Sequence, residues 1–221
     1  MTILEAMEHR HAVRSYLDRP IPADIVAALQ AEVEAYNAEA GLHIQLITDE
    51  PRAFGSFTAH YGMFSGVKNY FALVGKKSDG LDEALGYYGE RLVLQAQMLG
   101  LNTCWVAMSF SRSKCGAVID AGEKLVIVIP VGYGTTQGKP HKSKPLERLC
   151  SVSGTMPDWF RAGMDAAMLA PTAVNQQKFL LTLHEDTVQA RATGGFYSKV
   201  DLGIVKYHFE LGAGKENFRW A

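Results

Sequence analysis

Apolar residues recur at helical spacing in several segments of the chain. In residues 25–37, Leu29 and Val33 fall on one side of a helix, which Asp24 can cap and Gly41 can end. The same spacing predicts a long central helix over residues 81–99, and the full set of predicted helices covers residues 25–37, 81–99, 110–121, 159–169 and 201–211.

Short apolar or alternating runs predict strands between these helices. Residues 124–131 are apolar after Lys124, which suits a strand in the middle of a sheet. Residues 49–68 mix glycines with aromatic side chains and predict an irregular or weakly helical segment. The predicted strands are residues 42–48, 70–74, 124–131 and 179–183, and residues 101–108 form a strand or an extended loop.

The order helix, strand, loop and second helix occurs twice. One constant shift aligns Pro22 with Pro157 together with the helices that follow them. We therefore predict a duplication, with a first repeat over residues 1–145 and a shorter second repeat over residues 146–221, packed together as one unit. Each half carries polar residues that the other lacks, as in a symmetric dimer that was fused and then lost one of its two sites.

Composition and charge remove several classes of function. The chain has 221 residues and a formal net charge of −1, so no general field attracts nucleic acid or anionic membranes. No apolar run reaches the roughly 18 residues of a membrane span, and the N-terminus lacks a signal-peptide core. Cys104, Cys115 and Cys150 are widely spaced, and the histidines show no metal-ligand spacing. We expect a soluble cytoplasmic protein without a metal site.

Two basic clusters are candidates for holding a phosphate. Arg10 and Arg14 are four residues apart and would share one face of a helix, where two guanidinium groups can bind a phosphate through paired hydrogen bonds. Lys142 and Lys144 could complete such an anion site. The alternative is a solvated basic face, which two arginines alone favour.

A polar loop, residues 170–178, is the third candidate. Pro171 stops the preceding helix because it lacks an N–H group. The carboxamides of Asn175, Gln176 and Gln177 carry donors and acceptors that can bind the edge of a planar heteroaromatic ring. An ordinary polar connection between a helix and a strand is the alternative.

Several stretches of the chain resemble motifs of the FMN-dependent nitroreductases. The stretches are 10–16 (Arg-His-Ala-Val-Arg-Ser-Tyr), 99–105 (Leu-Gly-Leu-Asn-Thr-Cys-Trp), 129–133 (Ile-Pro-Val-Gly-Tyr), 142–146 (Lys-Ser-Lys-Pro-Leu) and 170–177 (Ala-Pro-Thr-Ala-Val-Asn-Gln-Gln). No stretch is specific alone, but together they span most of the chain. Ala12 stands where the family has a phosphate-binding serine. The 170–177 loop follows the first helix in the family, but here it lies in the second half.

The family forms intertwined homodimers in which that loop reaches the flavin of the other subunit. The chain therefore resembles a branch with two half-repeats fused into one chain, a monomer acting as a pseudo-dimer, with further dimerisation left open. The resemblance implies an α+β fold with a central, mainly antiparallel sheet flanked by helices, and FMN as cofactor. The residues that it assigns to FMN are Arg10, His11, Arg14, Val106, Ala107, Met108, Lys142, Lys144, Pro171, Thr172, Ala173 and Asn175.

In this assignment, Arg10, Arg14 and either Lys142 or Lys144 hold the phosphate. The 170–177 loop contacts the ring and ribityl chain, and the backbone of residues 106–108 faces the flavin N5. The resemblance also implies an oxidoreductase that uses NAD(P)H to reduce a nitroaromatic, quinone or similar acceptor, with no catalytic side chain because the flavin carries the chemistry. The absence of a Gly-x-Gly-x-x-Gly motif agrees with NAD(P)H as a transient substrate.

Two other functions stay open. A flavin enzyme of the same fold could act on a different acceptor, by dehalogenation or dehydrogenation. A flavin-binding or structural protein with little turnover is the other alternative, and the loss of the serine at Ala12 favours it. Tyr61, Phe64 and Tyr87 are further candidates for the walls of a pocket.

Overall fold

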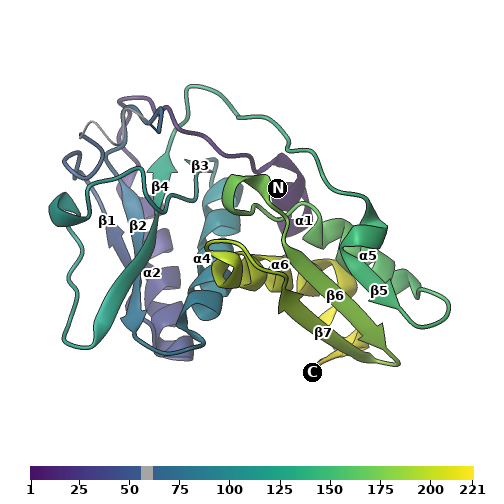
Figure 1. The fold of residues 1–221 in the computed structure, drawn as a ribbon. Coiled ribbons are helices and arrows are strands. Elements are labelled where there is room, and N and C mark those ends of the chain that lie inside the picture. Colours follow the sequence, from purple (N-terminus) through teal and green to yellow (C-terminus); the bar gives the residue numbers. More distant parts are fainter. Residues whose placement is uncertain (56–61) are drawn as a thin grey trace. The chain divides into compact units, whose positions relative to one another are not determined.

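A computed structural model describes residues 1–55 and 62–221 as two compact units (Figure 1). Unit 1 comprises Met1–Leu81 and Leu92–Pro140, and unit 2 comprises Asp82–Arg91 and His141–Ala221. Helix α4 (Leu81–Met98) contributes residues to both units. Among the described residues, no helix combines the length and the apolar character needed to cross a membrane.

Unit 1 contains a four-stranded sheet in the order β1-β2-β4-β3, and every pair of neighbouring strands is antiparallel. The ten-residue strand β4 is buried over most of its length, because it lies between β2 and β3. Helix α2 lies beside this sheet in Figure 1. The elements are α1 (Ile3–His9), α2 (Ala23–Ala40), β1 (Gln45–Ile47), β2 (Tyr70–Lys76), β3 (Asn102–Thr103), η1 (Arg112–Lys114) and β4 (Glu123–Gly132).

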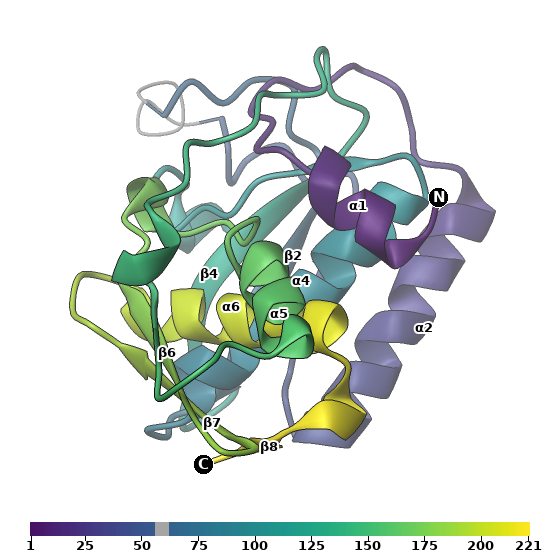
Figure 2. The same cartoon turned by 90° about the vertical axis from the view of Figure 1, so that its right-hand side faces the viewer.

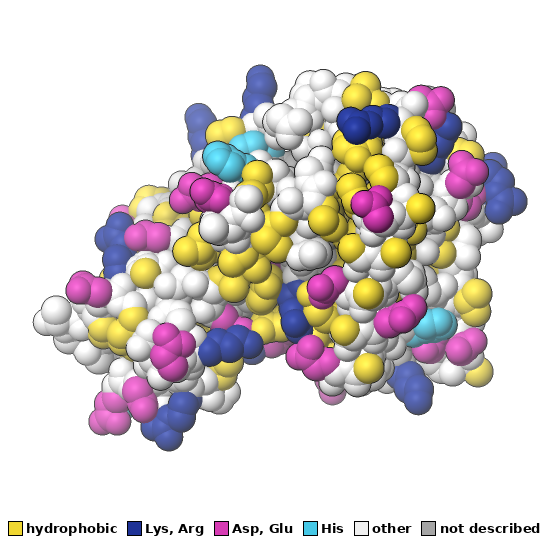
Figure 3. Space-filling view, turned by 180° about the vertical axis from the view of Figure 1, so that it is seen from behind, with side chains coloured by type: hydrophobic (Ala, Val, Ile, Leu, Met, Phe, Trp, Pro, Cys, Tyr) yellow, Lys and Arg dark blue, Asp and Glu magenta, His cyan; other side chains and the backbone are white. Residues whose placement is uncertain are grey.

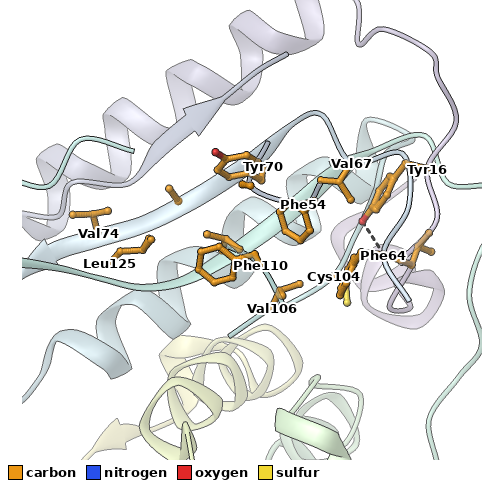
Figure 4. Close-up of a cluster of buried hydrophobic side chains, with 14 residues drawn as sticks. Tyr16, Phe54, Phe64, Val67, Tyr70, Val74, Cys104, Val106, Phe110 and Leu125 are labelled. Carbon is orange, nitrogen blue, oxygen red and sulfur yellow. Dashed lines mark hydrogen bonds between the residues drawn. The ribbon is translucent and has the colours of Figure 1, made fainter. Parts of the chain in front are cut away.

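Aromatic rings fill the core of unit 1 (Figure 4). The ring centroid of Phe54 lies 5.4 Å from that of Phe64 and 5.9 Å from that of Tyr70. Tyr16 is buried at the other side of this cluster, and its hydroxyl donates to the carbonyl oxygen of Val13 at 2.8 Å. The core therefore anchors the segment that follows Arg14.

Unit 2 contains a second four-stranded sheet, in the order β5-β6-β7-β8. Strands β6 and β7 form an antiparallel hairpin, and the short outer strands pair with it in parallel. Helices α5 and α6 lie side by side in Figures 1 and 2. The elements are η2 (Leu146–Arg148), β5 (Cys150–Val152), α5 (Asp158–Ala167), η3 (Ala173–Asn175), β6 (Phe179–His184), β7 (Thr187–Ala192), α6 (Ser198–Ala213), η4 (Lys215–Asn217) and β8 (Arg219–Trp220).

Two glycines let α4 and α6 approach each other within unit 2. A Cβ atom on Gly203 would lie 2.0 Å from the carbonyl oxygen of Glu83, and one on Gly86 would lie 2.1 Å from that of Val200. The fully buried His208 of α6 makes a 2.9 Å contact from Nε2 to Oε1 of Glu90 on α4. These contacts require small residues and a paired polar group at the helix crossing.

The structure confirms the α+β class that the sequence predicted. The helices expected over residues 25–37, 81–99, 159–169 and 201–211 correspond to α2, α4, α5 and α6. The sheet arrangement differs, because each unit has its own sheet. The boundary at residue 145 and the duplication stay predictions.

The helix predicted over residues 110–121 is wrong, because only η1 forms there. The N–H of Gly116 donates to the hydroxyl of Tyr70 at 2.8 Å, and the amide of Gln45 binds both the N–H and the carbonyl of Val118. Side chains distant in sequence therefore satisfy backbone groups that a helix would have paired locally.

Candidate functional site

The arginine segment of unit 1 is extended, so the prediction that Arg10 and Arg14 share a helix face is wrong. Helix α1 ends at His9, and Arg10 already has extended backbone angles. Further along, Ala12 forms a parallel bridge with Thr103, and the N–H of Val13 donates to the carbonyl oxygen of Thr103 at 3.0 Å. Pairing with β3 thus replaces the helix and lays the segment along the edge of the sheet.

Both arginine side chains nevertheless lie near one buried thiol. Arg10 is 4% exposed, whereas Arg14 is exposed and its guanidinium carbon lies 5.9 Å from the ring centroid of Phe64. Burial raises the pKa of Cys104 to about 11, and the positive charges of Arg14 and Arg10 oppose that rise. Both cations that the sequence proposed for an anion therefore act on the same thiol. His11 is close to Gly138, where an added Cβ would lie 2.7 Å from the Cβ of His11.

Within residues 106–108, the backbone of Val106 is hydrogen-bonded in the sheet, whereas Met108 is exposed. Val106 exchanges two hydrogen bonds with Val128, at 2.9 and 3.0 Å, so its N–H is used within the sheet. Met108 is 73% exposed. Arg112 donates to the carbonyl oxygens of Leu125 and Val126. An N–H for a ligand would therefore come from Ala107 or Met108.

The polar loop of unit 2, residues 171–177, has an unusual backbone. Val174, Asn175 and Gln177 have φ angles of 45°, 55° and 44°. Asparagine tolerates this left-handed region, but a β-branched valine does so only with strain. The side chain of Val174 is also 81% exposed, so burial does not offset the strain. Strained backbone of this kind persists where the surroundings hold it.

The carboxamides of this loop bind the protein itself, which changes their expected role. Gln177 is 4% exposed, and its Nε2 donates to the carbonyl oxygen of Lys142 at 2.8 Å and to Oδ1 of Asn175 at 2.7 Å. Nδ2 of Asn175 donates to the same Lys142 carbonyl at 2.9 Å. The sequence predicted amides open to a ligand, but these two amides build the loop.

Asp201, in the first turn of α6, holds the opposite side of the loop. Its Oδ1 accepts the N–H of Ala173 at 2.9 Å, and its Oδ2 accepts Nε2 of Gln176 at 2.7 Å. The residue is 5% exposed. Burial raises the pKa of Asp201 to about 6, while the hydrogen bonds from Gln176 and Ala173 act to lower it.

The two lysines predicted for the phosphate have different surroundings. Nζ of Lys144 donates to the carbonyl oxygens of Gln176 and Gln177 at 2.6 and 3.0 Å, and its backbone N–H donates to Oε1 of Gln177 at 2.8 Å. The ammonium group of Lys144 is thus engaged by the loop. The side chain of Lys142 is exposed, which leaves Lys142 as the better candidate of the pair.

The aromatic residues considered for pocket walls have structural contacts of their own. Phe64 belongs to the core of unit 1. The hydroxyl of Tyr87 donates to Oε2 of Glu210 at 2.5 Å and accepts from Nζ of Lys215 at 2.8 Å. Burial and the neighbouring Glu210 raise the pKa of Tyr87. Tyr61 lies outside the described residues.

Unit 1 also holds a pocket of about 490 Å³ beside the start of α2. Its lining includes the ion pair of Lys68 and Asp18, whose atoms Nζ and Oδ1 are 2.6 Å apart, and the guanidinium of Arg19 stacked on Tyr133. None of the residues predicted for FMN lines it. On the face in Figure 3, basic and acidic side chains are interspersed.

His43, Asp120 and Glu123 offer possible metal ligands within 4.8 Å of one another. Spacing along the chain could not reveal this group, because His43 lies far in the sequence from Asp120 and Glu123. Nδ1 of His43 lies 2.8 Å from Oε2 of Glu123, and this hydrogen bond is the main cause of a lowered pKa of Glu123. Hydrogen bonds to Glu123 explain why the three residues lie together at the start of β4.

Sequence reasoning missed Asp201 and the structural role of Lys144. The one available signal for Asp201 was a carboxylate flanked by the apolar residues Val200 and Leu202. A buried carboxylate is unusual and indicates a specific partner.

Comparison with known proteins shows which family the chain resembles. Residues 2–213 match the family model described as "Putative TM nitroreductase". A crystal structure of a "putative nitroreductase" from Thermotoga maritima has 21% sequence identity and a TM-score of 0.67, over 96% of this chain and 83% of that chain. No curated protein matches the chain in sequence.

Two shorter structures share the fold over part of the chain. A "putative nitroreductase" from Desulfovibrio desulfuricans, in complex with FMN, has 20% identity and a TM-score of 0.52, over 67% of this chain and 95% of that chain. A "Putative NADH dehydrogenase/NAD(P)H nitroreductase" from Bacteroides thetaiotaomicron has 18% identity and a TM-score of 0.53, over 66% and 95%. At these identities the structures establish a common fold.

Proposed function

Because the chain belongs to the nitroreductase family whose model spans residues 2–213, we propose that it is an FMN-dependent oxidoreductase. It takes electrons from NAD(P)H and passes them to a small acceptor such as a nitroaromatic compound or a quinone. FMN, when bound, supplies the hydride and electron transfer, so the side chains have to bind and orient it. The family match carries the proposal, and the FMN in the related Desulfovibrio structure supports the choice of cofactor.

In this proposal Arg10 and Arg14 bind the FMN phosphate. Guanidinium groups match the geometry of phosphate oxygens and stay charged at all relevant pH values. Their approach to the same thiol, that of Cys104, supports their assignment to one anion. Lys142 rather than Lys144 supplies the further cation, because the ammonium of Lys144 is engaged by two carbonyl oxygens.

The isoalloxazine ring and ribityl chain are assigned to Pro171, Thr172, Ala173 and Asn175, and the edge near N5 to the backbone of Ala107 and Met108. The internal hydrogen bonds of the loop favour this assignment, since a ligand loop that is already ordered loses little conformational entropy on binding. The duplication belongs to the same proposal, as a fusion of two half-repeats in one chain.

Binding of FMN and of riboflavin separates the phosphate contacts from the ring contacts. The wild-type chain is expected to bind FMN more tightly than riboflavin, because riboflavin lacks the phosphate. Two charge-assisted hydrogen bonds contribute roughly 1.5–3 kcal/mol each, so Arg10→Ala with Arg14→Ala should weaken FMN binding by about 100-fold or more. Riboflavin binding should change little.

Arg161→Ala is the matched control, because this exposed arginine of α5 pairs with Asp165. Fluorescence titration measures all affinities, and circular dichroism shows whether each variant is folded. If the folded double variant kept its preference for FMN over riboflavin, the phosphate assignment would be wrong. If the wild-type chain bound no flavin, the proposed function would be wrong.

A further inference from the structure

The 171–177 loop is held from two sides by opposite charges. Asp201 accepts an N–H group and an amide from one side, through Ala173 and Gln176. Lys144 donates from the other side to two carbonyl oxygens, those of Gln176 and Gln177. Gln176 is bound by both partners, and all of these residues belong to unit 2. The Asp201 carboxylate thus accepts from N–H donors, and the Lys144 ammonium donates to carbonyl oxygens, so each charge faces groups of matching polarity.

We infer that Asp201 and Lys144 are positioning residues that hold this loop in its ligand-binding conformation before flavin arrives. The inference deepens the proposed function and rests on it wherever flavin binding is measured. Without the clamp, the left-handed angles of Val174, Asn175 and Gln177 would relax, because these residues favour other backbone regions when unconstrained.

The burial of Asp201 supports a positioning role. A carboxylate that is 5% exposed loses most of its hydration, and two donors replace only part of it. An apolar residue at this buried place on α6 would carry no such penalty. The carboxylate therefore serves the loop and not the packing of the helix.

The loop needs Lys144 as a second partner because its two ends differ in polarity. A 3-10 turn directs its N–H groups one way and its carbonyl groups the other, so one side chain cannot satisfy both. Thr172 completes the arrangement, because its Oγ1 accepts the N–H of Gln177 at 3.0 Å. The exposed tip that results is the side chain of Val174, which the loop presents outward.

Amide hydrogen exchange on the flavin-free protein tests the clamp directly. In Asp201→Asn a neutral acceptor replaces the carboxylate, and the Ala173 amide should exchange about tenfold faster. The Leu181 amide of β6 donates to the carbonyl oxygen of Leu149, just before β5. It is the internal reference, and its exchange rate should not change. In Lys144→Met the amides of Asn175 and Gln176 should exchange faster, again without a change at Leu181.

Asp165→Asn is the matched control, since it makes the same chemical change at an exposed carboxylate of α5. It should leave the loop amides unchanged. Unaltered exchange at Ala173 in Asp201→Asn would overturn the clamp. Equal acceleration at Leu181 would also overturn it, because the residue would then support unit 2 as a whole. The Lys144→Met variant decides the question if Asp201→Asn does not fold.

Flavin binding then tests whether the clamp serves the ligand. Asp201→Asn should weaken FMN and riboflavin by the same factor, at least fivefold, because the ring contacts are shared and the phosphate contacts are untouched. A general loss of folding would also weaken both flavins by one factor, but it would accelerate the Leu181 amide as well. Faster exchange with unaltered flavin affinity would refute the positioning role. Failure of the wild-type chain to bind flavin would refute that role with the proposed function, while hydrogen exchange would still decide whether the clamp exists.

Discussion

Replacement of Asp201 should change how the stability of the protein depends on pH. The pKa of this carboxyl is about 6 in the folded chain, against an ordinary value of 3.8. A raised folded-state pKa stabilises the fold fully below pH 3.8, and that contribution is lost as the pH rises through about 6. The complete loss is about 3 kcal/mol, of which about 1.4 kcal/mol falls between pH 5 and pH 8.

The Asp201→Asn variant has no such titration. Its free energy of unfolding, relative to that of the wild-type protein, should therefore rise by about 1.4 kcal/mol between pH 5 and pH 8. Groups with a lowered pKa, such as Glu50 and Glu123, act in the opposite direction, but they are common to both proteins and cancel in the difference. The variant thus gains stability on the alkaline side while its loop opens more readily.

Urea unfolding at four pH values, followed by tryptophan fluorescence, measures this difference. Trp159 and Trp220 both belong to unit 2 and report on the unit that contains Asp201. Asp165→Asn is the control, since it makes the same chemical change at an exposed carboxylate. A flat difference for Asp201→Asn would refute the conclusion that burial controls this carboxyl.

Three further substitutions test the fold around the loop. Gly203→Ala should destabilise unit 2 by about 2–4 kcal/mol in urea unfolding, since its Cβ would lie 2.0 Å from the Glu83 carbonyl oxygen and separate two helices; a neutral result would contradict that contact. Glu90→Leu should cost about 1–3 kcal/mol because Nε2 of buried His208 loses its partner while Nδ1 keeps the Ala166 carbonyl, and an unchanged melting temperature would argue against the pair. Val174→Asn should relieve about 1 kcal/mol of backbone strain and so raise the melting temperature. A lower melting temperature would show that valine is unstrained at this position.

The sequence predicted elements whose signal is local. Helix α4 and strand β4 were recognised from apolar spacing within their own segments, and α4 ends one residue before the predicted end. Residues 115–120 could not be predicted in the same way. The backbone N–H groups of Gly116 and Val118 bind Tyr70 and Gln45, which lie far away in the sequence, so helical spacing was misleading.

The candidate site shows the same limit. The arginines and the loop were identified by residue type, because phosphate and ring binding require guanidinium, amide and small side chains. Lys144 was of the right type for a phosphate, but nothing in the sequence shows that two carbonyl oxygens engage its ammonium group. Asp201 was passed over because its partners, Ala173 and Gln176, come from another segment of the chain.

Anaerobic reduction of the flavin-loaded protein tests the central claim most directly. The wild-type chain is loaded with FMN, freed of excess flavin, and mixed without oxygen with NADH or NADPH while the visible spectrum is recorded. The proposed oxidoreductase should lose its yellow absorbance with at least one of the two nicotinamides, and a quinone or nitroaromatic acceptor added afterwards should restore it. A yellow protein that neither nicotinamide bleaches would contradict the claim of turnover and leave a flavin-binding protein.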